Sequence, residues 1–326
     1  MHICLVIDAQ LPTQRYGGTE RVVYWLGRAL HQAGHKVTFL AQQSQLDFAN
    51  VLVLDKTRSI ESQIPKEVDI VHMHSGFKFP QNIPTCQTIH GNCRHPTTFH
   101  PNSIFVSNSH AQNHNATAFV HNGLDASDYG SVDFSTKKSS FVFLAKAAWG
   151  VKNVRGAIDV AALTESTIDI LGGHRLNFKM GFRLTLAKNA RFHGMVDDKV
   201  KIPFLQQARG LVFPVLWHEP FGVATIEAMY FGVPIFGTPY GALPEIVGEG
   251  AGFLSNSTHE LAEAAKNWRS YDRAAIHAHW KQCFTSSIMA KKYIEYYTMI
   301  LDGQNLHANL IHAQPVRTSK LLDWKP

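Results

Sequence analysis

Two glutamates in one short stretch of the chain have the type and spacing to act on a ligand. The stretch reads HEPFGVATIE, from His218 to Glu227, and places Glu219 eight positions before Glu227. Paired carboxylates can serve as acid and base on one bond when they lie about 5–9.5 Å apart. One continuous helix would separate these two by about 12 Å along its axis, but Pro220 and Gly222 argue against such a helix. The pattern therefore favours two carboxylates that contact separate parts of an extended ligand. A solvated position for Glu227 on a helix face stays open.

Glycines beside two predicted helix starts could bring backbone amides close to an anion. Gly222 stands where the helix after Glu219 should begin, and Gly17 and Gly18 precede the first helix of the chain. A helix amino terminus carries unpaired N–H groups and partial positive charge, so both places suit a phosphate. Glycine pairs before helices also occur in plain tight turns, and for Gly17 and Gly18 the sequence leaves both interpretations open.

The elements that must position these residues alternate between strand and helix patterns, twice over. Short apolar runs typical of buried parallel strands occur at 2–7, 35–41, 51–54, 69–74, 85–90 and 103–108, with a helix at 19–34 that Thr19 would cap and Gly34 would end. After a polar stretch at 133–140 the alternation restarts, with strands at 141–146, 168–173, 210–216 and 233–237 and helices at 154–163, 196–208, 222–232, 258–271 and 286–301. Two successive βα domains are expected, with a ligand where their strand ends face each other. The chain after Gly303 predicts a loose tail.

Composition bounds the class of protein. The chain has 326 residues, of which 45% are hydrophobic, and a formal net charge of +6. That charge fits a solvated surface, an anionic ligand or an anionic membrane face, and the lack of a basic-aromatic motif argues against nucleic acid. Because the chain shows neither a secretory signal nor an apolar run of about 20 residues, it is expected to be cytoplasmic, with peripheral membrane contact left open.

One cluster of residues has types that suit zinc. Cys86, His90, Cys93 and His95 lie close together in the sequence, but their spacing lacks a C-x-x-C pair, and Cys86 and His90 fall in one predicted strand. Positions four apart in a strand spread by about 13 Å. No metal site is expected, and free thiols are the simpler interpretation of both cysteines.

The chain resembles the retaining GT-B glycosyltransferases of family GT4, the glycosyl transferases group 1. The segments that carry the resemblance are EPFGVATIEAMYFGVPIFG, YGGTERVVYWLGRALHQAG, DIVHMHSG, QTIHG and VHNGLDASDY, and it extends from Met1 to about Leu301. It implies an α/β GT-B fold, with two Rossmann-like βα domains facing each other across a cleft and a C-terminal helix that returns to the N-terminal domain. The implied parts are an acceptor domain at 1–135, a donor domain at 136–284, a crossover helix at 285–302 and a tail at 303–326.

The resemblance also implies roles for the donor-binding residues. Glu227 would bind ribose hydroxyls and Glu219 hydroxyls of the transferred sugar. The amides of Phe221, Gly222 and Val223 would bind the sugar and diphosphate, Gly17 and Gly18 would form the opposite wall, and Met195 and Val196 would touch the base.

Catalytic roles follow from the same resemblance, with one departure from the family pattern. His90 would point at the reacting sugar, and Lys146 and Lys152 would bind the diphosphate. The family usually has Arg where this chain has Lys146, and a lysine cannot fork across two phosphate oxygens, so weaker donor binding or an altered donor pose is expected. His72, His74, His110 and His121 are further candidates to line the site, with no assigned role.

The function implied is that of a metal-independent retaining hexosyl- or glycosyltransferase without a cofactor, acting in cell-surface polysaccharide biosynthesis. Its donor would be a UDP-, GDP- or ADP-sugar, and its acceptor a hydroxyl of a glycan, a lipid-linked glycan or a small molecule. Two alternatives remain at this point: a nucleotide-sugar epimerase of the same fold, and a catalytically degenerate transferase acting as a partner subunit. The second is kept because of the lysine at position 146.

Overall fold

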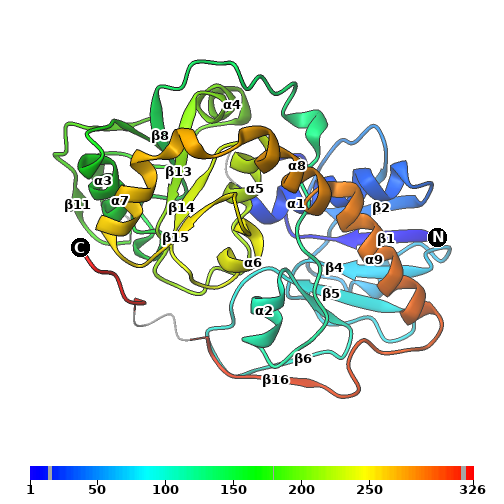
Figure 1. The fold of residues 1–326 in the computed structure, drawn as a ribbon. Helices are drawn as coiled ribbons and strands as arrows, with labels where there is room; N and C mark the ends of the chain where they lie inside the picture. Colours follow the sequence, from blue (N-terminus) through cyan, green and yellow to red (C-terminus); the bar gives the residue numbers. More distant parts are fainter. Residues whose placement is uncertain (14–16, 179, 317–320) are drawn as a thin grey trace. The chain divides into compact units, whose positions relative to one another are not determined.

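The computed structural model describes residues 1–13, 17–178, 180–316 and 321–326, in two compact units. Among these residues, unit 1 comprises Met1–Thr13, Gly17–Asp125 and the chain from Phe284 to residue 316. Unit 2 comprises Ala126–Cys283 and residues 321–326. Figure 1 shows the strands and helices of both units, most of them labelled. Unit 1 ends its first part at Asp125, whereas the sequence placed the domain boundary at residue 135.

Unit 1 is built on a six-stranded parallel sheet. Its strands are β1 (His2–Val6), β2 (Lys36–Ala41), β3 (Asn50–Val53), β4 (Ile70–Met73), β5 (Thr85–Ile89) and β7 (Ser103–Phe105). They lie in the order β3-β2-β1-β4-β5-β7, so the strand order reverses between β1 and β4. This is the doubly wound arrangement, in which ligands bind at the carboxyl ends of the strands beside the reversal.

The helices of unit 1 cover this sheet. They are α1 (Gly18–Gln32), α2 (Asn108–Gln112) and α9 (Ser286–Leu301), with a 3-10 turn η1 (Glu61–Gln63). The predicted cap at Thr19 is wrong: Gly17 is the N-cap, no side chain caps the helix, and Thr19 lies inside its first turn. The prediction that the C-terminal helix belongs with the first domain is confirmed, since α9 packs against α1 and β5.

Unit 2 repeats the same sheet plan. Its parallel strands are β8 (Ser140–Leu144), β9 (Ile168–Leu171), β12 (Ala190–Phe192), β13 (Ala208–Phe213), β14 (Ile235–Gly237) and β15 (Gly252–Leu254). They lie in the order β12-β9-β8-β13-β14-β15, with the reversal between β8 and β13. Phe141, Phe213 and Phe236 are fully buried in its core.

The helices of unit 2 follow its strands. They are α3 (Val154–Leu163), α4 (Asp198–Gln206), α5 (Val223–Tyr230), α6 (Leu243–Val247), α7 (Thr258–Lys266) and α8 (Arg273–Cys283), with 3-10 turns η2 (Ala126–Asp128), η3 (Gly150–Lys152) and η4 (Trp268–Ser270). Helix α4 contains Pro203 and is capped by the Asp197 carboxylate, which accepts from the amide of Val200. The predicted helix at 258–271 ends at Lys266, and α8 follows as a separate helix.

Two short antiparallel pairs complete the units, and one of them corrects the prediction of a loose tail. β6 (Thr97–Phe99) pairs with β16 (Ile311–Ala313) in unit 1, and β10 (Leu176–Asn177) pairs with β11 (Arg183–Leu184) in unit 2. Beyond β16, the amide of Leu322 donates to the carbonyl of Leu216 at 2.9 Å, and Lys325 exchanges backbone hydrogen bonds with Asn256 and Thr258. The tail is anchored because its backbone finds partners that its weak side-chain pattern did not reveal. Within the described ranges, the longest apolar helices fall short of what crossing a bilayer requires.

Candidate functional site

The candidate residues of unit 2 gather where its strand order reverses. Lys146 and Lys152 follow the carboxyl end of β8, and Glu219 follows that of β13, before α5 begins. In open α/β sheets this is the place where ligands bind. The topology thus brings together residues that lie far apart in the sequence.

Glu219 forms a buried ion pair with Lys152. The Nζ atom of Lys152 lies 2.5 Å from Oε2 of Glu219, and each side chain is 8% exposed. The same Oε2 accepts a hydrogen bond of 2.6 Å from the indole Nε1 of Trp217. Glu219 therefore has a fixed position, and it holds the lysine that the sequence assigned to the diphosphate.

Aromatic rings surround the ammonium of Lys152. Its Nζ lies 4.9 Å from the ring centroid of Trp217, 5.3 Å from that of Phe213 and 5.6 Å from that of Trp149. Ring faces attract a cation electrostatically, and the attraction strengthens where water is excluded. Ion pair and rings together stabilise a positive charge at the end of the sheet.

Glu227 is held in the same way by different residues. Its Oε1 lies 2.5 Å from Nζ of Lys201, on α4, and accepts a 2.5 Å hydrogen bond from the hydroxyl of Tyr129. Lys201 also pairs with Asp198 at 2.7 Å and lies 5.3 Å from the centroid of the Tyr129 ring. Glu227 is 5% exposed, so it is not the solvated helix-face carboxylate that the sequence left open.

Each of the two carboxylates keeps one oxygen outside these contacts. Oε1 of Glu219 and Oε2 of Glu227 accept no hydrogen bond from any residue that the structure describes. A carboxylate oxygen has room for about two hydrogen bonds. Both glutamates are thus oriented by the protein through one oxygen while the other can accept from a ligand hydroxyl.

The backbone between the glutamates turns at Gly222. This residue is the N-cap of α5, and its φ of 90° lies in the left-handed region that favours glycine. A Cβ atom there would lie 3.4 Å from Cγ of Glu219. The glycine ends the strand-to-helix connection and lets α5 start beside Glu219, with Phe221 buried and Val223 as the first helical residue.

The remaining predicted donor residues lie on two loops of unit 2. Lys146 is half-buried just after β8, and its ammonium has no ion-pair or hydrogen-bond partner among the described residues. Met195 and Val196 lie between β12 and the N-cap of α4, so the predicted base loop runs directly into the helix that carries Lys201. The structure thus gives Lys152, Glu219 and Glu227 defined side-chain partners, whereas the donor roles of Lys146, Met195 and Val196 stay predictions.

In unit 1, the predicted catalytic histidine belongs to a row of histidines at the ends of β4 and β5, in which His72 and His74 are buried and His90 is half-buried. Nδ1 of His74 lies 3.0 Å from Nε2 of His90. His72 contacts the Tyr297 hydroxyl at 2.6 Å and that of Thr88 at 2.7 Å. The hydroxyls of Tyr297 and Thr88, both in the core of unit 1, therefore fix the position of the His72 ring.

Burial keeps these histidines neutral near pH 7. Burial lowers the pKa of His90 to about 4. It lowers the pKa of His74 well below 6.5, with the neighbouring rings of His72 and His90 adding to the effect. A neutral imidazole can both donate and accept a hydrogen bond, which suits His90 to a sugar hydroxyl better than to a phosphate.

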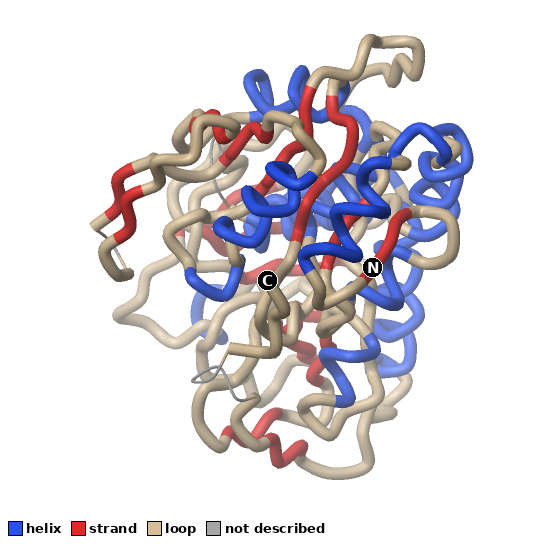
Figure 2. Tube along the Cα trace, turned by 60° about the vertical axis from the view of Figure 1, so that its left-hand side comes forward, coloured by secondary structure: helices blue, strands red, loops and turns tan. Residues whose placement is uncertain are grey.

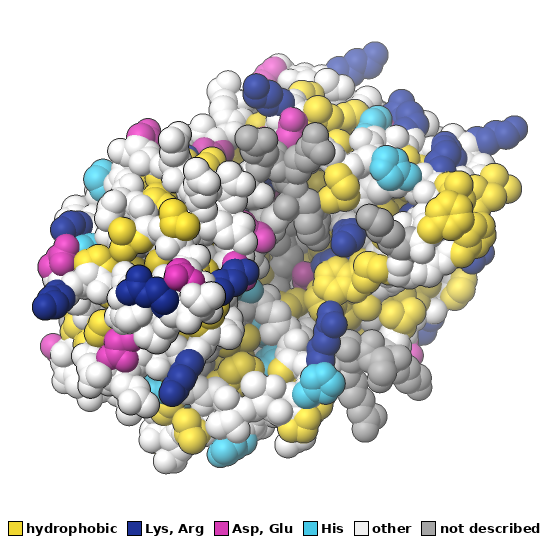
Figure 3. Space-filling model, turned by 180° about the vertical axis from the view of Figure 1, so that it is seen from behind, with side chains coloured by type: hydrophobic (Ala, Val, Ile, Leu, Met, Phe, Trp, Pro, Cys, Tyr) yellow, Lys and Arg dark blue, Asp and Glu magenta, His cyan; other side chains and the backbone are white. Residues whose placement is uncertain are grey.

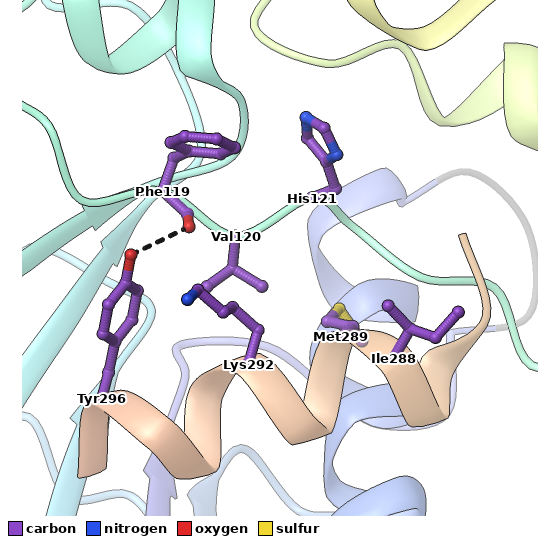
Figure 4. Close-up of a pocket in the computed structure, with 7 residues that line it drawn as sticks. All are labelled: Phe119, Val120, His121, Ile288, Met289, Lys292 and Tyr296. Carbon is purple, nitrogen blue, oxygen red and sulfur yellow. Dashed lines mark hydrogen bonds between the residues drawn. The ribbon is translucent and has the colours of Figure 1, made fainter. Parts of the chain in front are cut away.

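The other candidates of unit 1 lie elsewhere. Gly17 is the N-cap of α1 and Gly18 is its first residue. Residues 14–16, directly before them, lie outside the part of the chain that the structure describes. His110 is buried on α2. His121 lines a cavity of about 330 Å³ with Phe119, Val120 and four residues of α9, Ile288, Met289, Lys292 and Tyr296. Figure 4 shows these α9 side chains on one side of the helix, with the Tyr296 hydroxyl donating to the carbonyl of Phe119.

Metal ligation finds no support in the described part of the chain. No group of three or more His, Cys, Asp or Glu side chains there is arranged to hold a metal ion. Cys86 is buried, and burial raises the pKa of its thiol. Cys93 donates from Sγ to the carbonyl of Gln314.

Lys201, Tyr129, Trp149 and Trp217 are site residues that the sequence analysis missed. Trp217 stands two positions before Glu219, so its nearness was readable. Tyr129 and Lys201 reach Glu227 from 98 and 26 residues away. Only the fold brings them together, since nothing in their local sequence distinguishes them from surface residues.

Residues 138–269 match the family model described as Glycosyl transferases group 1. The matched range contains both glutamates and both of the lysines that pair with them. The site in unit 2 thus lies in a Glycosyl transferases group 1 domain.

Curated relatives align with part of this chain. O-antigen chain mannosyltransferase C of Escherichia coli is 24% identical over 167 residues, covering 47% of this chain and 45% of that protein. O-antigen chain mannosyltransferase B of Escherichia coli is 30% identical over 165 residues, covering 43% of this chain and 42% of that protein. Sucrose synthase of Thermosynechococcus vestitus is 38% identical over 87 residues, covering 26% of this chain and 10% of that protein. The chain spans less than half the length of each of these relatives.

Solved structures resemble the chain over almost all of its length. AviGT4, a glycosyltransferase involved in avilamycin A biosynthesis, superposes with a TM-score of 0.79 at 21% identity, covering 93% of this chain and 98% of that chain. Anabaena HepE in complex with UDP-glucose superposes with a TM-score of 0.64 at 15% identity, covering 91% and 99%. These likenesses confirm the predicted GT-B fold of two Rossmann-like domains.

Proposed function

We propose that the chain is a glycosyltransferase that takes its sugar from a nucleotide-diphosphate sugar and transfers it with retention of anomeric configuration. The observation that carries the proposal is the pair of buried carboxylates, each oriented by a lysine and an aromatic donor through one oxygen only. Such carboxylates suit the recognition of neighbouring hydroxyls. The family match over residues 138–269 supports the reaction class, and the UDP-glucose complex of Anabaena HepE supports the class of donor.

The donor roles follow from the free oxygens. Glu227 Oε2 would accept from the ribose hydroxyls, and Glu219 Oε1 would accept from the transferred sugar. The amides at the start of α5, at Gly222 and Val223, would face the diphosphate, where the helix adds partial positive charge. Met195 would contact the base from the loop ahead of α4, because that loop leads directly to the partner of Glu227.

The lysines would stabilise the leaving group. In the reaction, the bond between the anomeric carbon and the diphosphate oxygen breaks, and negative charge grows on the diphosphate. Lys152 and Lys146, which both follow β8, would neutralise that charge and so lower the barrier without a protein nucleophile. The acceptor oxygen would bond to the same face of the anomeric carbon, and its proton would pass to the departing diphosphate. His90 would hold a hydroxyl of the reacting sugar.

The acceptor is proposed from the relatives. Both E. coli relatives carry names of O-antigen chain mannosyltransferases, so the proposed acceptor is a hydroxyl of a cell-surface glycan or its lipid-linked precursor. The lysines supply the charge that a divalent cation would otherwise provide, so the reaction is proposed to need no metal. Transfer should continue unchanged in excess EDTA, and a loss that Mg²⁺ or Mn²⁺ restores would overturn this part.

A binding experiment with matched variants tests the donor site. Calorimetry should show binding of one of UDP, GDP or ADP and of its sugar, and Glu227→Gln should weaken the affinity by about tenfold, because a charge-assisted hydrogen bond contributes roughly 1.5 kcal/mol. Glu263→Gln, an exposed carboxylate on α7 of the same unit, is the control and should bind as the parent does. If no nucleotide binds, or if both variants bind alike, the donor assignment fails.

A further inference from the structure

A hairpin in unit 2 presents an apolar face to solvent. β10 and β11 pair antiparallel, with Leu176 opposite Leu184 and Asn177 opposite Arg183. Every even position from 176 to 186 is apolar, and these residues are between 47% and 78% exposed. We call these six residues the apolar hairpin face: Leu176, Phe178, Met180, Phe182, Leu184 and Leu186.

The polar side of the hairpin is the side that attaches to unit 2. The guanidinium of Arg183 donates to the carbonyls of Ala147 and His174. The guanidinium of Arg175 donates to three carbonyls, those of Thr185, Ala187 and Ala190. Because alternate residues of a strand point to opposite sides, fixing the polar side inward turns the apolar side outward. A hairpin that served only the fold would bury its apolar side on the core.

The hairpin stands apart from the main sheet of unit 2. It forms a separate two-stranded sheet, and its two short strands project at the left of Figure 2. Seen from behind, hydrophobic side chains gather at the right-hand edge, beside Lys and Arg side chains (Figure 3). At these exposed fractions, the six side chains together leave roughly several hundred Å² of apolar surface uncovered. An apolar patch of that size is at the upper end of what a soluble protein exposes without a partner.

The sequence around the hairpin is strongly basic. Residues 170–196 contain five Lys and Arg, at 175, 179, 183, 188 and 191, and no Asp or Glu, which gives a formal charge of +5. The whole chain has a formal charge of +6. The nearest acidic residues along the chain are Asp169, Asp197 and Asp198, and Asp169 pairs with Arg191 at 2.9 Å. The hairpin itself, residues 175–188, holds four Lys and Arg and no Asp or Glu, so its formal charge is +4.

This charge decides between two possible occupants of the apolar hairpin face. A second copy of the chain, docked through the same face, would bring two hairpins of formal charge +4 together, and like charges at an interface cost several kcal/mol. An anionic bilayer surface attracts them instead, at about 1 kcal/mol per Lys or Arg near the surface. Leu, Phe and Met side chains also enter the boundary between headgroups and acyl chains readily.

We propose that this hairpin docks unit 2 on an anionic lipid bilayer. The apolar hairpin face enters the interfacial layer, and the exposed Lys188 lies among the lipid phosphates. The arginines on the opposite side of the hairpin add long-range attraction to the anionic surface. The inference does not depend on the proposed donor chemistry, since it uses none of the residues that bind Glu219 or Glu227. It gives a lipid-linked acceptor a physical route to the protein.

Vesicle flotation of the full chain tests the proposal. The protein should float with vesicles of equal phosphatidylcholine and phosphatidylglycerol, bind phosphatidylcholine alone far more weakly, and be released by high salt, which screens surface charges. Phe178→Ser/Phe182→Ser should lower binding to the anionic vesicles by roughly tenfold or more, because two large apolar side chains no longer enter the interface. Lys188→Glu should weaken it as well.

Controls separate docking from a folding defect. Val53→Ser/Leu310→Ser removes two similarly exposed apolar side chains from unit 1 (66% and 52% exposed) and should float as the parent does. The hairpin variant should keep the thermal unfolding temperature and any nucleotide binding of the parent. Equal binding by parent and hairpin variant would overturn the proposal, and so would equal losses in both double variants. Sedimentation showing a dimer that the hairpin variant dissociates would overturn it in favour of a second copy.

Discussion

The buried pair of Lys152 and Glu219 allows stability and donor binding to be measured separately. Removing one member of a buried ion pair typically costs about 3–5 kcal/mol, because the other charge is left without its partner. Lys152→Met leaves the carboxylate of Glu219 with only the indole of Trp217. Glu219→Gln leaves the lysine with only its aromatic neighbours. Each single variant should therefore lose about 3 kcal/mol of unfolding free energy or more.

The double variant is the decisive one. Lys152→Met/Glu219→Gln removes both charges, so it should recover most of the loss, since replacing a whole buried pair is often close to neutral. It should still fail to bind a nucleotide sugar, because both proposed contacts are gone. A matched pair on the surface of unit 2, Lys266 and Glu263, lies at 2.6 Å with 47% and 69% exposure. Its corresponding variants should each change stability by less than about 1 kcal/mol.

Tryptophan fluorescence during urea unfolding provides the measurement. Five of the six tryptophans, at 149, 217, 268, 280 and 324, lie in unit 2, so the signal follows that unit. If the two single losses simply add in the double variant, Lys152 and Glu219 are not coupled and the reasoning is refuted. The same holds if either single loss is no larger than that of the surface pair.

Three further predictions concern other parts of the chain. Tyr129→Phe removes one hydrogen-bond donor to Glu227. In a calorimetric titration the affinity for the nucleotide should fall about fivefold, which corresponds to roughly 1 kcal/mol. An unchanged affinity would count against the role of Glu227. Burial lowers the pKa of His110 to about 3, so the unfolded state binds more protons below pH 6.5. The free energy of unfolding from urea titrations should therefore fall as the pH drops from 6.5 towards 4, by about 1.4 kcal/mol per pH unit for each such histidine. In His110→Asn this slope should be smaller, and an equal slope would contradict the prediction. Deleting residues 321–326 removes the backbone bonds to Leu216 and Asn256 and should destabilise unit 2 by about 2–4 kcal/mol in the same urea assay; no change would show that the tail contributes nothing.

The sequence predicted those parts of the fold that local pattern determines. The helices at 154–163 and 286–301 have the predicted bounds, because their apolar spacing and their end residues agree with each other. The turn at Gly222 was also readable, since a glycine between a strand and a helix has few other uses. The cap at Thr19 was wrong because Gly17, one residue outside the helix, already fills that position.

The contacts that orient the site could not be predicted from the sequence. Lys201 and Tyr129 carry no local signal, and they meet Glu227 only because α4 and the chain after residue 126 pack beside α5. In the hairpin of β10 and β11 a clear local pattern exists, but it predicts the wrong orientation. Its alternating pattern is that of a strand with one buried face, yet the structure attaches the polar face and exposes the apolar one. Orientation relative to the core is a property of the whole unit, so a two-residue period does not reveal it.

A crystal structure of the full chain with the nucleotide-diphosphate sugar that binds most tightly would test the central claim most directly. The account predicts Oε2 of Glu227 within hydrogen-bonding distance of the ribose hydroxyls and Oε1 of Glu219 within reach of the sugar, with Lys152 turned towards the diphosphate. A nucleotide bound away from the carboxyl ends of β8 and β13, or one that leaves both glutamates without a ligand contact, would contradict it.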